Sequence, residues 1–276
     1  MLEFFADQTV RTVLLGALVL GASTGALGVF AVLRRQSLLG DLLAHAALPG
    51  IVMGYFVAGE RSLGALLLGA LVSGVLAALL ALALARFPGV RREAAIGATL
   101  VLSFALGLVL LSVAERTPGV QSGALQTFLF GQAAATVQRE VVLLVVTALI
   151  LAFALAVVFR AATSVAFDPD FARAQGVRVL ATEVWLTALL AVAIVIGLQM
   201  VGVVLMAALV IAPAVAAKQW ARNVWHMTVL AAVIGGASGL VGASISALQP
   251  GLATGPLIVL TATACAVLAI FTRRRA

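Results

Sequence analysis

Nine long apolar segments dominate this 276-residue chain and constrain its fold more than any other feature. The hydrocarbon core of a bilayer is about 30 Å thick, and a helix needs about 20 apolar residues to cross it. The segments cover residues 11–33, 38–57, 62–86, 93–114, 139–160, 179–198, 201–217, 226–246 and 254–272. The sequence therefore predicts an all-α polytopic membrane protein with eight or nine transmembrane helices in a single domain, residues 1–276. The lower number applies if one segment is re-entrant or interfacial.

The composition excludes a soluble domain and argues against a nucleic-acid partner. Hydrophobic residues make up 64% of the chain and charged residues 10%, against about 25% charged in soluble proteins. The net charge of +7 comes from short basic clusters between the apolar segments, as the positive-inside rule predicts. The favoured orientation leaves only four of the 17 basic residues outside: Arg11, Arg61, Arg116 and Arg139. It puts the N-terminus outside for nine spans and inside for eight.

Local patterns predict how the helices end and pack. Three glycine pairs have the small-xxx-small spacing that lets helices approach closely: Gly21 and Gly25, Gly50 and Gly54, and Gly235 and Gly239. Pro49 is expected to end the second helix early. Only Gln199 and Met200 separate the sixth segment from the seventh, so they are expected at an outer junction. There they would either face an outer access route or simply lie at the interface. The longest outer connection is expected over residues 115–139.

Asp41 and His45 are ionisable residues in an otherwise apolar helix. Four residues apart, they share one helix face. Pro49 has no N–H, so the carbonyl of His45 loses its helical partner and adds a third donor nearby. A carboxylate with an imidazole suits manganese, iron or zinc. Two interpretations stay open: a structural pair satisfied by neighbouring helices, or a metal station in an ion pathway.

A short amphipathic helix is expected on the cytoplasmic side, near residues 167–178. Asp168 can cap it, Pro169 suits its first position, and Gly176 can end it. It is either an ordinary interfacial helix or a docking element for a soluble partner. The residues expected to form the contact face are Phe171, Ala172 and Gln175.

Four motifs, in order along nearly the whole chain, resemble the permease subunit of bacterial ABC importers for manganese, zinc or iron. They are SLLGDLLAHA at 37–46, DPDFA at 168–172, VGVVLMAALVIAPA at 201–214 and TGP at 254–256. One departure is Ala44, where many relatives carry serine. The resemblance implies a type II importer-like fold, with Asp41 and His45 in the metal path. It also implies that the short cytoplasmic helix couples to an ATPase.

The resemblance further implies the partners and the location. These are an ATP-binding subunit, an extracellular or periplasmic metal-binding protein, a second copy of the chain and the lipid bilayer of a bacterial plasma (inner) membrane. No cofactor is expected to be permanently bound, and the metal (Mn, Zn or Fe, with manganese favoured) is cargo. The only lysine, Lys218, lacks the glycines of a P-loop, so ATP hydrolysis is expected in a separate subunit and the chain is not expected to be an enzyme.

The alternative is a stand-alone secondary transporter driven by ions or protons. In that case Asp41 and Glu183 would form the relay. Otherwise Glu183, one turn inside the sixth segment, is expected to pair with Arg178 or Arg173. An intramembrane enzyme is disfavoured, because the chain has no paired catalytic motif such as His-Glu-x-x-His.

Overall fold

The computed structural model describes residues 8–59, 62–116, 131, 138–249 and 252–272. Within these ranges the chain forms helices joined by short connections, and no strand is present. The helices are α1 (Gln8–Leu33), α2 (Leu38–Ala58), α3 (Leu63–Leu84), α4 (Arg92–Arg116), α6 (Gln138–Phe167), α7 (Pro169–Ala174), α8 (Val179–Val201), α9 (Val203–Trp220), α10 (Val224–Leu248) and α11 (Thr254–Phe271). The expected connection at 115–139 lies mostly outside the described residues.

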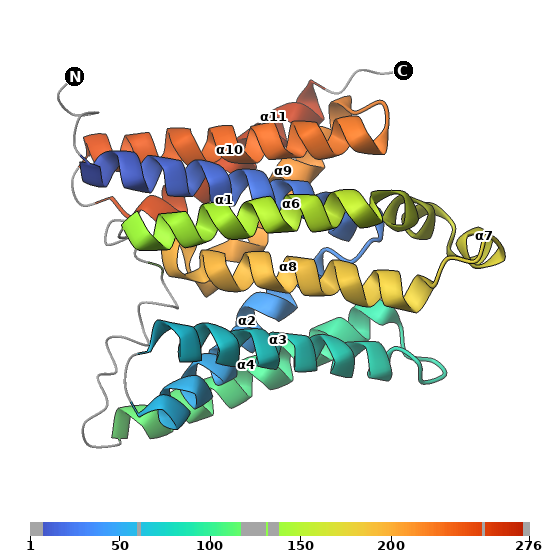
Figure 1. The fold of residues 1–276 in the computed structure, drawn as a ribbon, viewed down its shortest axis with the longest axis horizontal. Coiled ribbons are helices and arrows are strands. Elements are labelled where there is room, and N and C mark those ends of the chain that lie inside the picture. The colour runs from blue at the N-terminus through green and yellow to red at the C-terminus, as the bar shows by residue number, and fades with distance from the viewer. Residues whose placement is uncertain (1–7, 60–61, 117–130, 132–137, 250–251, 273–276) are drawn as a thin grey trace.

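Eight of these helices are long and apolar enough to cross a membrane. The ninth long helix, α9, has 18 residues and is about 27 Å long at about 1.5 Å per residue. It runs back along the bundle from the end of α8 to the start of α10 (Figure 1). The nine apolar segments thus correspond to nine long helices, and α1 begins at the opposite end of the bundle from the end of α11 (Figure 1).

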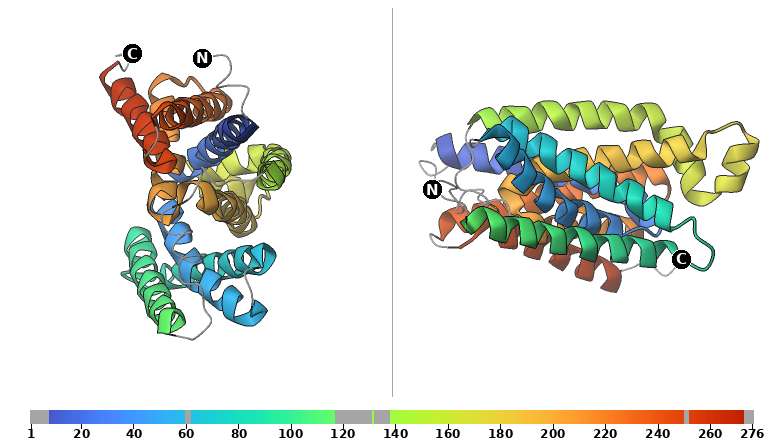
Figure 2. Two further views of the ribbon diagram at one scale, coloured as in Figure 1. Left: turned by 90° about the vertical axis from the view of Figure 1, so that its left-hand side faces the viewer. Right: turned by 90° about the horizontal axis from the view of Figure 1, so that it is seen from below.

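The helices form two groups that meet along a seam. Helices α2, α3 and α4 pack together on one side, and α1, α6, α9, α10 and α11 pack on the other, as Figure 2 shows. Helix α8 lies between the two groups, where it contacts both α2 and α3. Helix α2 also reaches α9, so it connects the two groups.

Close helix contacts confirm the role expected for the three glycine pairs. An added Cβ on Gly21 would lie 2.1 Å from the carbonyl oxygen of Gly235, so the α1 and α10 backbones touch there. The same close approach joins α2 to α3, where a Cβ on Gly50 would lie 2.0 Å from the carbonyl oxygen of Gly69. Small residues allow backbone contacts of this kind in lipid, where apolar burial does not drive helices together.

Gly21→Ala is expected to lower the melting temperature of the purified protein in detergent. The new methyl group must push α1 and α10 apart, and overpacking of this kind costs about 1–3 kcal/mol. The matched control is Gly97→Ala, because a Cβ on Gly97 meets nothing within 4 Å. Scanning fluorimetry of both variants measures the difference, and equal melting temperatures would contradict the close contact.

The expectation that Pro49 ends the second helix is wrong. Helix α2 continues through Pro49 to Ala58. Pro49 is buried, and a Cβ on Gly107 of α4 would lie 2.9 Å from its ring, so α4 packs directly against the proline. Membrane helices tolerate an internal proline when neighbouring helices compensate for the lost hydrogen bond. Tight packing therefore keeps α2 unbroken where the local sequence favours a stop.

Basic and aromatic residues gather at one end of the bundle. Arginines lie in three connections at this end, those between α1 and α2, α3 and α4, and α9 and α10. Arg61 and residues 273–275 lie outside the described part of the chain. Trp220 and Trp225 flank the α9–α10 turn and are 42% and 62% exposed. Tryptophan favours the boundary between lipid and water, and arginine favours the cytoplasmic side. We infer that this end, on the right in Figure 1, is cytoplasmic.

Candidate functional site

Asp41 and His45 lie one turn apart near the cytoplasmic end of α2, and their side chains meet. The Nε2 atom of His45 is 3.2 Å from Oδ1 of Asp41. From Leu39 to Val52 every residue of α2 is buried except these two. The Asp41 side chain is 33% exposed and the His45 side chain 15% exposed. The pair therefore forms the only opening to the surface along this stretch of α2.

The other ring nitrogen of His45 is a buried atom without a partner. Its Nδ1 makes no hydrogen bond within the described residues. The ring stacks edge-on against Phe104 of α4, with centroids 4.7 Å apart and planes at 67°. Sequence reasoning missed Phe104, because nothing local links residues 45 and 104. A buried polar atom without a partner is costly, which favours a partner outside the chain, such as water or an ion.

One chain supplies only part of a metal site. No group of three or more His, Cys, Asp or Glu side chains comes together among the described residues. Structural metal sites use four protein ligands, whereas sites that exchange ligands keep positions open. Asp41 and His45 can therefore hold an ion only with help from water or from a second chain. Such a half-site suits an ion that passes through and leaves.

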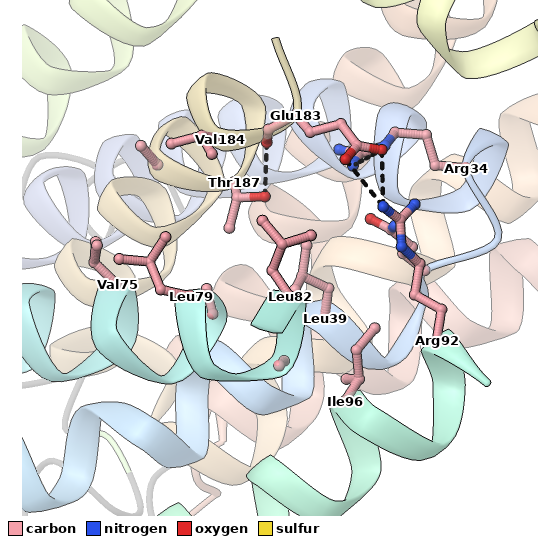
Figure 3. Close-up of a pocket in the computed structure, with 14 residues that line it drawn as sticks. Arg34, Leu39, Val75, Leu79, Leu82, Arg92, Ile96, Glu183, Val184 and Thr187 are labelled. Carbon is pink, nitrogen blue, oxygen red and sulfur yellow. Dashed lines mark hydrogen bonds and ion pairs between the residues drawn. The ribbon is translucent and has the colours of Figure 1, made fainter. Parts of the chain in front are cut away.

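The expected pairing of Glu183 with Arg178 or Arg173 is wrong. Glu183 binds Arg34 at 3.2 Å and Arg92 at 2.9 Å (Figure 3). Arg173 instead pairs with its near neighbour Asp170 on α7. The two partners of Glu183 are far from it in sequence, so only the packing of α8 beside α1 and α4 reveals them.

The arginine at the end of α1 is deeply buried for a charged group. The Arg34 side chain is only 7% exposed. Burial lowers the pKa of Arg34 below its ordinary value, while Glu183 opposes that shift. An arginine has so high a pKa that it stays protonated all the same. The charge on Arg34 is therefore permanent and needs the carboxylate beside it.

A short helix, α7, forms within the expected range 167–178, and it protrudes from the arginine-rich end of the bundle (Figure 1). The carboxylate of Asp168 accepts hydrogen bonds from the backbone N–H groups of Asp170 at 3.0 Å and Phe171 at 2.9 Å. Pro169 is the first helical residue, and Gly176 has a φ of +81° just after the helix. The helix proper is shorter than expected, because α6 continues to Phe167 and α8 starts at Val179.

The contact face expected on α7 is only partly exposed. Phe171 is 56% exposed, and Gln175 is also exposed. Ala172 is fully buried against Val165 of α6 and Val179 of α8, so it anchors α7 and does not belong to an exposed face. Phe171 and Gln175 remain available to a partner.

Gln199 and Met200 lie within the last turns of α8, and the junction falls two residues later at Gly202, whose φ is +88°. This corrects the expected position of the junction, since a glycine tolerates the positive φ of the turn. Met200 is 3% exposed, and its sulfur lies against Gly16 of α1, where an added Cβ would be 3.0 Å away. Met200 therefore belongs to the core. Gln199 has a buried Nε2 without a hydrogen-bond partner in the described chain and stays a candidate for the outer access route.

The fold defines a polytopic membrane protein that carries an Asp–His pair on α2 and a short protruding helix, α7. Residues 6–273 match the ABC 3 transport family. The chain belongs to this family. The resemblance drawn from the four sequence motifs is thereby confirmed, as is the expectation of a transport subunit rather than an enzyme.

Named relatives and a solved structure agree with this assignment. The chain is 40% identical over 270 residues to the zinc transport system membrane protein TroC of Treponema pallidum, covering 98% of this chain and 91% of that protein. It is 40% identical over 252 residues to the manganese transport system membrane protein MntC of Bacillus subtilis, covering 91% of this chain and 58% of that protein. The structure of PsaBC from Streptococcus pneumoniae in complex with Fab matches with a TM-score of 0.86 and 28% identity, covering 100% of this chain and 97% of that chain. The all-helical membrane fold is thereby confirmed.

Proposed function

We propose that this chain is the membrane subunit of an ATP-driven importer that moves a divalent transition metal into a bacterial cell. The observation that carries the proposal is the opening formed by Asp41 and His45, the only residues of α2 between Leu39 and Val52 that are not buried. Family membership supports the ATP-driven class, and the names of the relatives support zinc or manganese as cargo. Carboxylate and imidazole are ligands that both metals accept.

The proposed site is completed by a second copy of the chain. Two copies facing each other would supply two carboxylates and two imidazoles, enough for four protein ligands. Asp41 and His45 are accessible from the surface of a single chain, which this arrangement requires. Binding must stay moderate, because an ion that is held too tightly cannot leave. The site therefore acts as a transient gate.

The other proposed partners follow from the same class of transporter. An ATP-binding subunit docks on α7 through Phe171 and Gln175. A metal-binding protein delivers the ion from the outer side, where Gln199 lies near the α8–α9 turn. The complex resides in the bacterial plasma (inner) membrane. Domain organisation is simple: residues 1–276 form one permease domain.

A secondary transporter is the rival proposal, with Asp41 and Glu183 as its relay. The Glu183 carboxylate is already engaged by two arginines, at 2.9 and 3.2 Å, so it is not free to take part in a relay. Reconstituted vesicles distinguish the two mechanisms. Uptake of Mn²⁺ is expected only when the ATP-binding subunit and ATP are present. Uptake by the chain alone, driven by an ion gradient, would overturn the ATP-driven proposal.

The preferred metal is decided by competition in the same vesicles. Excess Zn²⁺ or Fe²⁺ is added to labelled Mn²⁺, with the delivery protein present. We propose manganese as the main cargo, so unlabelled Mn²⁺ is expected to compete most strongly. Stronger competition by Zn²⁺ would reassign the cargo while leaving the transport mechanism intact.

A further inference from the structure

An ionic cluster outside the metal path joins three helices at the cytoplasmic end. Arg92 donates from Nη2 to both carboxylate oxygens of Glu183, at 2.9 and 3.1 Å, and Arg34 lies 3.2 Å from the same carboxylate. The side chains of Arg34 and Glu183 are 7% and 11% exposed, whereas that of Arg92 is 44% exposed. Burying charges is costly, so removing one member of the buried pair leaves the other uncompensated.

Two of the three residues are connected to α2, which carries Asp41 and His45, and to α4, which packs against His45. Arg34 lies in the tight turn before α2, where the N–H of Gln36 donates to the carbonyl of Ala31 and the N–H of Leu39 to that of Gln36, both at 2.9 Å. Arg92 is the first residue of α4, the helix whose Phe104 packs on His45. The cluster is therefore directly connected to both α2 and α4.

Glu183 is tied to the cytoplasmic helix α7. It lies in the second turn of α8, and α8 follows α7 after residues 175–178. The N–H of Val177 donates to the carbonyl of Ala172 at 3.0 Å, and Ala172 packs against Val165 and Val179. These contacts join α7 to the start of α8, the segment that carries Glu183.

A partly open pocket lies at the seam beside the cluster. A cavity of about 70 Å³ lies between α8 and the group of α2, α3 and α4, with Arg34, Arg92 and Glu183 at one side. Its remaining wall is largely apolar, with Leu79 and Leu82 of α3 facing Val184 of α8 (Figure 3). Side chains that line this pocket do not pack against one another across it, so fewer contacts hold α8 against α3 there. The ionic cluster is then the strong contact across the seam.

We propose that Glu183 is a positioning residue for transport, which passes the displacement of α7 and α8 through Arg34 and Arg92 to α2, which carries Asp41 and His45, and to α4, whose Phe104 packs on His45. The inference rests on the proposed function, and it adds the link between the ATPase-facing helix and the metal pair. Without this link, the ATP-binding subunit still docks on α7 and hydrolyses ATP. The metal pair no longer responds, so hydrolysis and transport separate.

The test measures Mn²⁺ uptake and ATP hydrolysis together in vesicles containing the whole complex. Glu183→Gln and Arg92→Gln are each expected to lower the uptake per ATP by about tenfold, which lies within the range of about 5- to 150-fold that is typical of coupling between sites. Hydrolysis is expected to stay near the wild-type rate. Glu183→Gln leaves Arg34 buried without a counter-charge, so this variant also lowers the stability of the fold. Arg92→Gln leaves the buried pair intact and decides the result if the first variant does not assemble.

Matched controls are Glu93→Gln and Arg91→Gln, the same changes at exposed neighbours of Arg92. Both are expected to keep the wild-type uptake per ATP. The inference is overturned if Arg92→Gln keeps the wild-type uptake per ATP, even when uptake and hydrolysis both fall. The cluster would then have only a structural role. The proposed function is tested separately, by uptake in vesicles that contain the wild-type complex. If the wild type shows ATP-dependent uptake and Arg92→Gln keeps the same uptake per ATP, the inference is contradicted and the proposed function stands.

Discussion

Asp41→Ala and His45→Ala are each expected to reduce metal uptake by at least about 100-fold in vesicles containing the whole complex. Loss of a residue that only orients a metal ligand lowers metal affinity or activity by about 10- to 100-fold. Loss of a ligand itself is therefore expected to lower it by at least the upper value. In a paired arrangement each substitution removes one ligand from both copies. Labelled Mn²⁺ uptake at a fixed amount of assembled complex measures the effect.

Asp41→Asn separates the metal role from a structural role. Asparagine keeps the shape of the side chain and an oxygen facing Nε2 of His45, which is 3.2 Å away in the structure. A structural pair tolerates this change, whereas a metal site loses an anionic ligand. Uptake is therefore expected to fall with little change in melting temperature. His226→Ala, at the only other histidine, is the control, and near-normal uptake in Asp41→Asn would contradict the metal role.

Phe171→Asp is expected to detach the ATP-binding subunit or to abolish ATP-driven transport. Phe171 is 56% exposed on α7, which protrudes from the bundle, and such a position is typical of an aromatic anchor for a partner. Loss of such an anchor typically costs about 2–4 kcal/mol of binding. Co-purification of the two subunits and uptake in vesicles measure the loss.

The matched control for Phe171→Asp is Phe87→Asp. Phe87 is 63% exposed and lies in the cytoplasmic turn between α3 and α4. The substitution Phe87→Asp therefore adds the same negative charge on the cytoplasmic side but away from α7. Phe171→Leu keeps an apolar side chain and is expected to retain part of the binding. If Phe171→Asp co-purifies and transports like the wild type, α7 is an ordinary interfacial helix.

Features that depend on neighbours in sequence could be predicted well. The nine long helices follow from segment length and hydropathy, because each must satisfy its backbone internally in lipid. The cap at Asp168 depends on two N–H groups within three residues of it. The contact between Asp41 and His45 follows from one turn of helix.

Features that depend on distant neighbours could not be predicted. Local propensity favours a stop at Pro49, yet packing against Gly107 of α4 keeps α2 continuous. The amphipathic pattern placed Ala172 on the outer face of α7, yet α6 and α8 cover it. Glu183 has arginines near it in sequence, but its partners lie 91 and 149 positions away.

The sequence by itself therefore determined the membrane helices, the distribution of basic residues that favours one orientation, the Asp–His pair and the short capped helix. Hydrophobic length and hydrogen bonds over three or four residues are fixed by local chemistry. Only the tertiary structure decided that Asp41 and His45 form the single opening in a buried stretch of α2. It alone brought Glu183 between Arg34 and Arg92, because a buried carboxylate pairs with whichever cations the packed helices carry to it.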